Sequence, residues 1–258
     1  CFFIADDYRV YFDVFIRNTK LKSSIKNKQV HVKVTNWNCN NKNPEGEIIE
    51  VLGDINNLDV AINSILIDGG FANKFNSKIE KAAAGISKKI NSSEINSRLD
   101  LRKTPTFTID PNDAKDFDDA ISVQKLTNNN LEIGVHIADV GHYIKKDDII
   151  DKEALKRGTS VYLVDRVIPM LPEVLSNDLC SLKPKVDRLC FSVIFEINNK
   201  AEILDYKISK SIIHSNKRFT YKEAQDNIDN ASGEYHQELI DINNLAKIFR
   251  KKRKKEGS

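Results

Sequence analysis

Cysteines and long apolar runs are both scarce in this chain of 258 residues, and each scarcity excludes a class of protein. The four cysteines, at positions 1, 39, 180 and 190, show neither CxxC spacing nor a regular framework. They are therefore expected to be reduced thiols, as in cytoplasmic proteins. No apolar run approaches the length of a membrane span, and the first residues lack the pattern of a signal peptide. We therefore expect a cytoplasmic protein without membrane contact.

A large net charge is also lacking, because 40 Lys and Arg against 37 Asp and Glu leave only +3. The total charge therefore does not by itself indicate a nucleic-acid partner. Its distribution is more informative, since acids concentrate at residues 110–119 and basic residues concentrate near both ends. A composition of 40% hydrophobic and 30% charged residues is typical of a folded globular protein. The length allows two domains and a sizeable core.

The first 53 residues have the alternation of short β-strands separated by polar turns. The alternation places Val14 and Ile16 on one face of a strand. Residues 30–34 are expected to bury three valines, and residues 47–52 form a third strand. Small all-β units of this kind are commonly OB-type barrels.

Aromatic and basic side chains of this unit form a candidate RNA-binding face. Phe3 and Phe15 lie on strands, and Arg17 and Lys33 project beside them. A single-stranded nucleic acid needs rings that stack on bases and cations that meet phosphates. Alternatively, the rings belong to the core and the cations form a solvated face. Further lysines nearby are Lys20, Lys22, Lys26 and Lys28.

Residues 54–99 change character and read as a helical connector. Residues 58–67 and 75–86 have helical periodicity, and no Pro-rich or Ser-rich linker interrupts them. A further short helix is expected to use Ser92 or Ser93 as its cap. We therefore expect this segment to pack against the domain that follows.

The remainder of the chain alternates between strand and helix signals. Gly158 stops one expected helix, and Thr220 with Glu223 forms a capping box in front of another. The basic run 250–255 is interpreted as the solvated face of the last helix, with an RNA-binding tail as the alternative. The expected strands are 106–109, 120–123, 131–137 and 190–197, and the expected helices are 151–157, 221–228 and 235–254.

Five aspartates crowd into ten residues between two of the expected strands: Asp110, Asp113, Asp116, Asp118 and Asp119. Carboxylates this close repel one another unless a positive charge sits among them. Oxygen-rich clusters suit hard cations such as Mg²⁺, Mn²⁺ or Ca²⁺. An EF-hand loop is a poor match, because Ala114 stands at its fifth position and no Gly follows. The alternative is an acidic surface loop that caps a hairpin.

Longer motifs around this loop carry a family resemblance. TIDPNDAKDFDDAI is followed by GVHIADVGHYI and then by VYLVDRVIPMLPEVLSNDLCSLKP. Together they resemble the catalytic RNB domain of the ribonuclease II/ribonuclease R exoribonucleases, with a layout closest to bacterial ribonuclease R. FFIADD and DVFI resemble part of a cold-shock domain. The resemblance implies a mixed α+β fold that is incomplete at both ends: a cold-shock/OB-type domain at 1–53, a connector at 54–99 and part of an α/β RNB domain at 100–258.

The resemblance also implies the roles of the aspartates. Asp110, Asp116, Asp118 and Asp119 match the family's metal-binding positions. Asp118, together with Asp116, is implied to be catalytic, completing the second metal site and orienting the attacking water. The implied cofactor is Mg²⁺, as two ions, with Mn²⁺ as a substitute. Asp113 falls outside the pattern and is assigned to the turn.

Two residues further along resemble RNA-contacting positions of the family. Tyr162 matches the tyrosine that stacks on the last base of the RNA, and the alternative is an amphipathic core residue. Arg166 is expected either to contact phosphate or to hold its loop through a carboxylate. His136 and His142 are interpreted as structural and not as principal metal ligands.

The implied function is a Mg²⁺-dependent 3′→5′ exoribonuclease, active in RNA degradation and turnover. It would release nucleoside 5′-monophosphates from single-stranded RNA, as a monomer with no obligate protein partner. One alternative is a non-catalytic RNA-binding fragment, because the family's downstream arginine-rich segment and C-terminal OB domain have no match here. Another is a structural domain that binds divalent ions.

Overall fold

Strands and helices are mixed along the whole chain, which confirms the α+β class expected from the sequence. The computed structural model describes residues 1–17, 25–37 and 43–257. The chain divides into two units, Cys1–Lys74 and Phe75–Ser258. The division falls inside the expected connector, so its helices are shared between the units.

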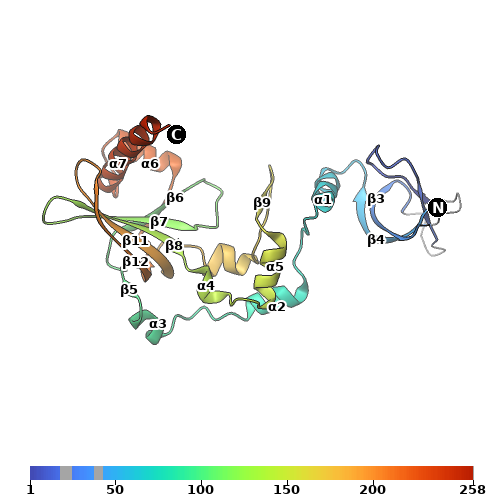
Figure 1. The fold of residues 1–258 in the computed structure, drawn as a ribbon, viewed down its shortest axis with the longest axis horizontal. Helices are drawn as coiled ribbons and strands as arrows, with labels where there is room; N and C mark the ends of the chain where they lie inside the picture. The colour runs from blue at the N-terminus through green and yellow to red at the C-terminus, as the bar shows by residue number, and fades with distance from the viewer. Residues whose placement is uncertain (18–24, 38–42, 258) are drawn as a thin grey trace. The chain divides into compact units, whose positions relative to one another are not determined.

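The first unit is built on a four-stranded sheet with the order β1-β2-β4-β3. Its strands are β1 (Phe2–Phe3), β2 (Val14–Ile16), β3 (Lys28–Asn36) and β4 (Glu45–Asp54) (Figure 1). β2 has the predicted alternation, with Val14 and Ile16 both buried. Helix α1 (Leu58–Asp68) lies against β4, where a Cβ added to Gly53 would stand 2.7 Å from Val60 Cγ2. A glycine is therefore needed at this close approach.

Strand β3 corrects one expectation, because its valines are not buried. Val30 and Val32 are half-buried, and Val34 is 38% exposed. The reason is the position of β3 at the edge of the sheet, together with three register irregularities against β4. Such irregularities interrupt the two-residue period on which the prediction depended.

The second unit is organised around a seven-stranded sheet with the order β13-β6-β7-β8-β11-β12-β5. The five strands from β6 to β12 in this order are antiparallel, whereas β13 and β5 add at the two edges in parallel. The strands are β5 (Leu99–Asp100), β6 (Thr106–Asp110), β7 (Asp119–Lys125), β8 (Leu131–Ala138), β11 (Asp187–Ile197), β12 (Ile203–His214) and β13 (Lys217–Thr220).

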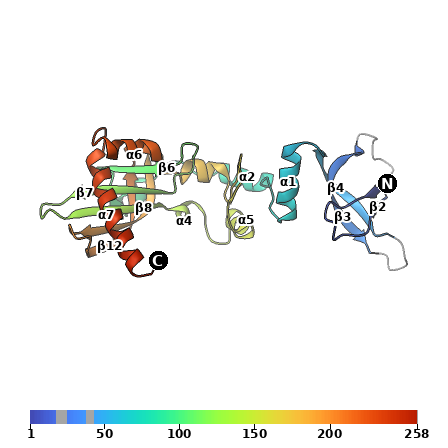
Figure 2. The same cartoon turned by 90° about the horizontal axis from the view of Figure 1, so that it is seen from above.

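Two C-terminal helices, α6 (Tyr221–Asp229) and α7 (His236–Lys255), cover part of one face of this sheet (Figures 1 and 2). Leu245 of α7 packs in a cluster with Val123 and Ile133 of the sheet. A second cluster joins Leu239 to Phe107 and Phe219. The helices are thus fixed to the sheet by apolar burial.

The remaining elements are short. They are α2 (Ser77–Ala84), α3 (Ser92–Asn96), α4 (Val140–Tyr143), α5 (Ile149–Arg157), a π-helix η2 (Leu175–Leu179), and a hairpin of β9 (Val161–Tyr162) and β10 (Val167–Ile168). α5 ends at Gly158, which has φ 73° as its predicted role requires. The capping box of Thr220 and Glu223 is present in front of α6, as predicted. The cap predicted for α3 is wrong: Ser92 is already helical, so the extended residue before it, Asn91, is the N-cap.

Three of the four cysteines lie in the described part of the chain, and all three are free thiols, as predicted. The basic run at 250–255 lies on the exposed last turns of α7, where positive charge is favourable. Within the described residues, no helix combines the length and the apolar character that crossing a membrane requires.

Candidate active site

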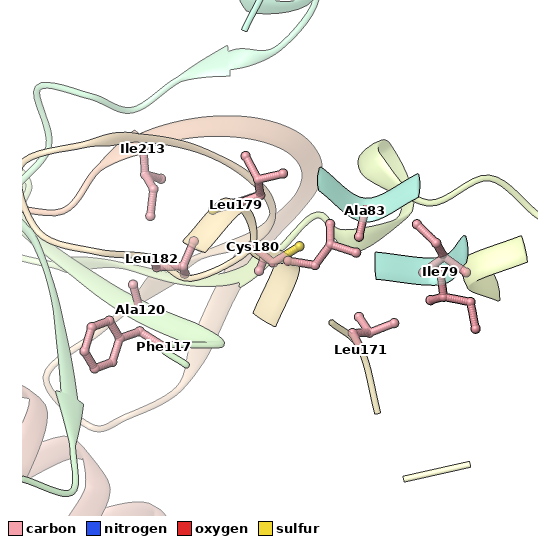
Figure 3. Packing of buried hydrophobic residues seen from close by; sticks show 13 residues of the cluster. Ile79, Ala83, Phe117, Ala120, Leu171, Leu179, Cys180, Leu182 and Ile213 are labelled. Atoms are coloured by element: carbon pink, nitrogen blue, oxygen red, sulfur yellow. The ribbon is translucent and has the colours of Figure 1, made fainter. Parts of the chain in front are cut away.

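The aspartates lie on the acid loop, residues 110–119, which joins β6 to β7 as predicted. β6 is anchored at one end of the loop, because Thr106, Phe107 and Thr108 are all buried. Phe117 anchors its middle, with only 8% of its surface exposed. Figure 3 shows the Phe117 ring beside Ala120 and near Leu182, within one buried cluster. The loop is therefore fixed to the core at both ends and between its aspartates.

Electrostatics show that the four predicted aspartates are neighbours in space. Asp118 is exposed as a residue, yet the packing around its carboxyl group raises its pKa, and repulsion from Asp116, Asp119 and Asp110 adds to the rise. Burial also raises the pKa of Asp110, and Asp119 and Asp116 add to the effect. Asp113, which the sequence assigned to the turn, is exposed.

An arginine that the sequence did not single out lies at this cluster. The positive charge of Arg218 opposes the rise in the pKa of Asp110. Its guanidinium donates a hydrogen bond to the carbonyl oxygen of Pro111 and lies 5.6 Å from the Phe117 ring centroid. Arg218 reaches the loop because β13 pairs with β6 in parallel, with Arg218 opposite Thr108. No local motif indicates a pairing between strands so distant in sequence.

Several polar atoms around this cluster are left without partners. Asp110 Oδ2, Thr108 Oγ1 and Arg218 Nε are buried and have no partner at good hydrogen-bond geometry, although the nearby Thr108 side chain lowers the pKa of Asp110 and so partly offsets its rise. A buried polar atom without a partner is costly, so it marks a place where a ligand or ion would be stabilising. Nevertheless, within the described residues no three His, Cys, Asp or Glu side chains are arranged to hold a metal ion. The structure thus gathers acidic groups without closing them into a coordination sphere.

Tyr162 lies at the edge of this cluster. Its hydroxyl donates to Asp116 Oδ2 at 3.5 Å, a long hydrogen bond. Withdrawal from water, followed by the charges of Asp116 and Asp118, raises the pKa of Tyr162. The side chain is nevertheless 67% exposed, so it is not a core residue. The β9–β10 hairpin therefore presents an open aromatic face next to the carboxylates.

Arg166, on the same hairpin, is engaged within its own loop. Its Nη2 lies 2.6 Å from Asp165 Oδ2, and its carbonyl oxygen accepts a hydrogen bond from the Leu163 amide at 2.8 Å. These contacts correspond to the loop-holding role expected as one of the two alternatives. A contact between Arg166 and phosphate stays a prediction.

In the first unit, strand pairing decides which aromatic rings share a face. Phe2 pairs with Phe15, and their ring centroids are 5.4 Å apart. Phe3 pairs with Val14 and so lies on the same face as that buried residue. Phe2, which the sequence did not single out, is 58% exposed. The exposed Phe2 and the half-buried Phe15 therefore form the aromatic pair on the other face.

The basic side chains predicted to bind RNA in the first unit differ in their exposure and in their ion pairs. Arg17 is exposed and forms an ion pair with Glu45 at 2.7 Å. Lys33 is exposed on β3. Lys20 and Lys22 lie outside the described residues. A role for Arg17 and Lys33 in RNA binding stays a prediction.

The two histidines left out of the site have structural surroundings. His136 is fully buried, with Nε2 2.9 Å from Ser122 Oγ and Nδ1 2.7 Å from Ser192 Oγ. Burial lowers its pKa to about 4, so the ring is neutral near pH 7. His142 Nδ1 lies 3.6 Å from Glu94 Oε1.

Two protein families match this chain. The RNB domain matches residues 98–258, and the cold-shock domain (CSD2) matches residues 2–76. Ribonuclease R of Thermotoga maritima is 38% identical over 264 residues, which cover 100% of this chain and 37% of the relative. Human exosome complex exonuclease RRP44 is 37% identical over 243 residues, covering 93% of this chain and 25% of the relative. The chain thus spans little more than a third, or less, of these relatives.

Solved structures share the fold. RNase R of Mycoplasma genitalium in complex with double-stranded RNA superposes with a TM-score of 0.89 at 28% identity, covering 100% of this chain and 48% of its own. Yeast Ssd1, described as a pseudonuclease, has a TM-score of 0.75 at 20% identity, covering 96% of this chain and 32% of its own. The second likeness shows the fold alone.

Proposed function

The chain belongs to the RNB family, and we propose from this that it is part of a metal-dependent 3′→5′ exoribonuclease. Its substrate would be single-stranded RNA, and its products nucleoside 5′-monophosphates. The observation that carries the proposal is the gathering of Asp110, Asp116, Asp118 and Asp119, with the Tyr162 hydroxyl 3.5 Å from Asp116 Oδ2. Acidic groups and an exposed ring are thus adjacent, as cleavage beside a stacked terminal base requires.

The donor set fits Mg²⁺ or Mn²⁺. Carboxylate oxygens are the preferred protein ligands of both ions, and Asp110 Oδ2 is a buried acceptor without a donor. A cation among the four aspartates would also offset the repulsion that raises the pKa of Asp118. When bound, two such ions would neutralise the phosphate and activate water.

Tyr162 and Asp118 would then have separate roles in binding and in hydrolysis. Tyr162, 67% exposed, would stack on the terminal base and hold it in place without regard to sequence. Asp118, as an anion, would orient the attacking water. The water gives up a proton as its oxygen becomes bonded to phosphorus, the bond from phosphorus to the 3′-oxygen breaks, and that oxygen takes up a proton in turn. The released nucleotide therefore keeps its 5′-phosphate, and the shortened RNA ends in a 3′-hydroxyl.

The first unit would bind RNA further from the cleaved end. Phe2 and Phe15 would stack on bases, and Lys33 would meet a phosphate. Support comes from the cold-shock match over residues 2–76 and from the RNA-bound structures of Mycoplasma genitalium RNase R.

A second candidate function is RNA binding without hydrolysis. The aromatic pair of Phe2 and Phe15 in the first unit favours it, because rings of this kind would stack on bases without any metal site. The fold does not decide between the candidates, since a protein described as a pseudonuclease shares it.

The deciding experiment incubates this chain with 5′-labelled single-stranded RNA in Mg²⁺ or in EDTA. We expect a ladder that shortens from the 3′ end only with Mg²⁺, and at least a 100-fold loss in Asp118→Asn, in line with the ~10²–10³ effect of removing one preorganised charge. Asp113→Asn is the matched control, because it removes an exposed carboxylate of the same loop. Intact RNA that is still bound would favour the second candidate. Cleavage that persists in EDTA would refute a metal-dependent mechanism.

A further inference from the structure

One buried hydroxyl contacts the acid loop on both sides of Asp116. Ser181 Oγ donates to the carbonyl oxygen of Lys115 at 2.9 Å and accepts from the amide of Phe117 at 3.1 Å. Ser181 is fully buried. It therefore fixes the backbone immediately before and immediately after an aspartate of the cluster.

The neighbouring backbone extends this contact to Asp118. The Leu182 amide donates to the carbonyl oxygen of Phe117 at 2.8 Å. On the other side, the Ala138 amide donates to the carbonyl oxygen of Asp118 at 3.0 Å. The loop segment that carries Asp116 and Asp118 is thus held between the segment at 181–182 and the end of β8.

Ser181 is itself held from β11. Arg188 Nε donates to the carbonyl oxygen of Ser181 at 2.8 Å, and Arg188 Nη2 donates to the carbonyl oxygen of Asp178 at 3.0 Å. Leu179 and Leu182, on either side of Ser181, lie in the same apolar cluster as Phe117 (Figure 3). The hydroxyl is therefore presented to the acid loop from a rigid support.

We propose that Ser181 is a positioning residue, whose hydroxyl sets the backbone on which Asp116 and Asp118 face the other two aspartates. The proposal deepens the proposed function and rests on it for its consequence, a metal site. Four like charges drive the loop apart unless its backbone is fixed. Each of the two backbone groups bound by Ser181 would lose a partner if the hydroxyl were removed.

The test compares Ser181→Ala and Ser181→Cys with the unmodified chain. Cys fills nearly the same space but forms only weak hydrogen bonds, so it separates the hydroxyl from the packing. Ser215→Ala is the matched control, because Ser215 is 1% exposed and its Oγ contacts the carbonyl oxygen of Lys217, away from the acid loop. Two quantities are measured: the Kd for Mn²⁺, and the hydrogen-exchange rate of the Phe117 amide.

Both Ser181 variants should raise the Kd for Mn²⁺ about tenfold and speed exchange of the Phe117 amide at least tenfold. Ser215→Ala should change neither by more than about twofold. If Ser181→Ala does not fold, Ser181→Cys decides. Unchanged affinity and exchange in a folded Ser181 variant would overturn the proposal. If the unmodified chain binds no Mn²⁺, the proposed metal site fails. Exchange at Phe117 then still decides whether Ser181 holds the loop.

Discussion

Charged and titratable side chains of the second unit are stabilised in different ways. Asp110 and Asp118 of the acid loop have raised pKa values, because burial and the neighbouring carboxylates disfavour their charged forms. His136 is buried as a neutral ring between two serines. Arg98 is buried as a cation, with Nε 2.6 Å from Glu94 Oε1 and Nη2 2.6 Å from Asp139 Oδ2. The last two contribute to folding.

His136 should make the stability of the second unit depend on pH. Its pKa falls from 6.5 to about 4 on folding, so the folded state excludes a proton that the unfolded state binds. Its contribution is therefore complete above pH 6.5 and is lost as the pH falls toward 4, by roughly 3 kcal/mol. Urea unfolding at several pH values should show the free energy of unfolding falling between pH 6.5 and pH 4. His136→Gln should reduce this pH dependence. His236→Gln is the control, because His236 is only half-buried and its Nδ1 bonds the carbonyl oxygen of Gly233; this variant should keep the pH dependence. An unchanged pH dependence in His136→Gln would contradict the assignment.

Arg98 should be essential for folding. Its side chain has no exposed surface, and Arg98→Met would leave Asp139, 5% exposed, without its partner. Breaking a buried pair from one side costs about 3–5 kcal/mol. Arg102→Met is the control from the same segment, since Arg102 pairs with Asp100 and Asp187 near the surface and its loss should lower the free energy of unfolding far less. Chemical denaturation measures the free energy of unfolding of both variants. An equal loss in Arg98→Met and Arg102→Met would show that the burial of Arg98 is unimportant.

At the scale of elements, local signals explain most boundaries. Thr220 and Glu223 set the start of α6, and Gly158 ends α5 with φ 73°. Both depend on neighbouring residues alone, so a sequence pattern suffices to predict them. β3 behaves differently, because its exposure depends on its edge position and on its register with β4.

Thr220→Ala should destabilise α6 measurably. It removes the hydroxyl that accepts from the Glu223 amide at 3.1 Å, which should lower the free energy of unfolding by about 1 kcal/mol. Lys222→Ala, in the exposed first turn, should change it by less than about 0.5 kcal/mol. Thermal unfolding followed by circular dichroism measures both. No loss in Thr220→Ala would mean that tertiary packing alone fixes this end of the helix.

At the scale of the whole molecule, the two units have separate interiors. Val14, Ile16, Val60 and Leu66 are buried in Cys1–Lys74. The three large apolar clusters all belong to Phe75–Ser258. Units with separate cores can unfold separately.

Calorimetry should therefore resolve two transitions in this chain. Mn²⁺ should raise the midpoint of the transition that belongs to the second unit, because a ligand stabilises the unit that binds it. A single-stranded oligonucleotide in EDTA should raise the midpoint of the other transition. Asp118→Asn should abolish the Mn²⁺ effect and keep the oligonucleotide effect. One cooperative transition, shifted equally by both ligands, would contradict independent units.

The sequence by itself determined the family, the α+β class, the acid loop between two strands and the four aspartates. These signals are local in the sequence: the aspartates lie within ten residues of one another, and the capping residues Thr220 and Glu223 lie within four. Only the tertiary structure decided which distant residues support the loop. Arg218 arrives through the parallel pairing of β13 with β6, and Ser181 through burial beside Phe117. Pairing registers likewise decided that Phe2, and not Phe3, accompanies Phe15. Such contacts depend on the registers and packing of segments far apart in the chain, which no local pattern specifies.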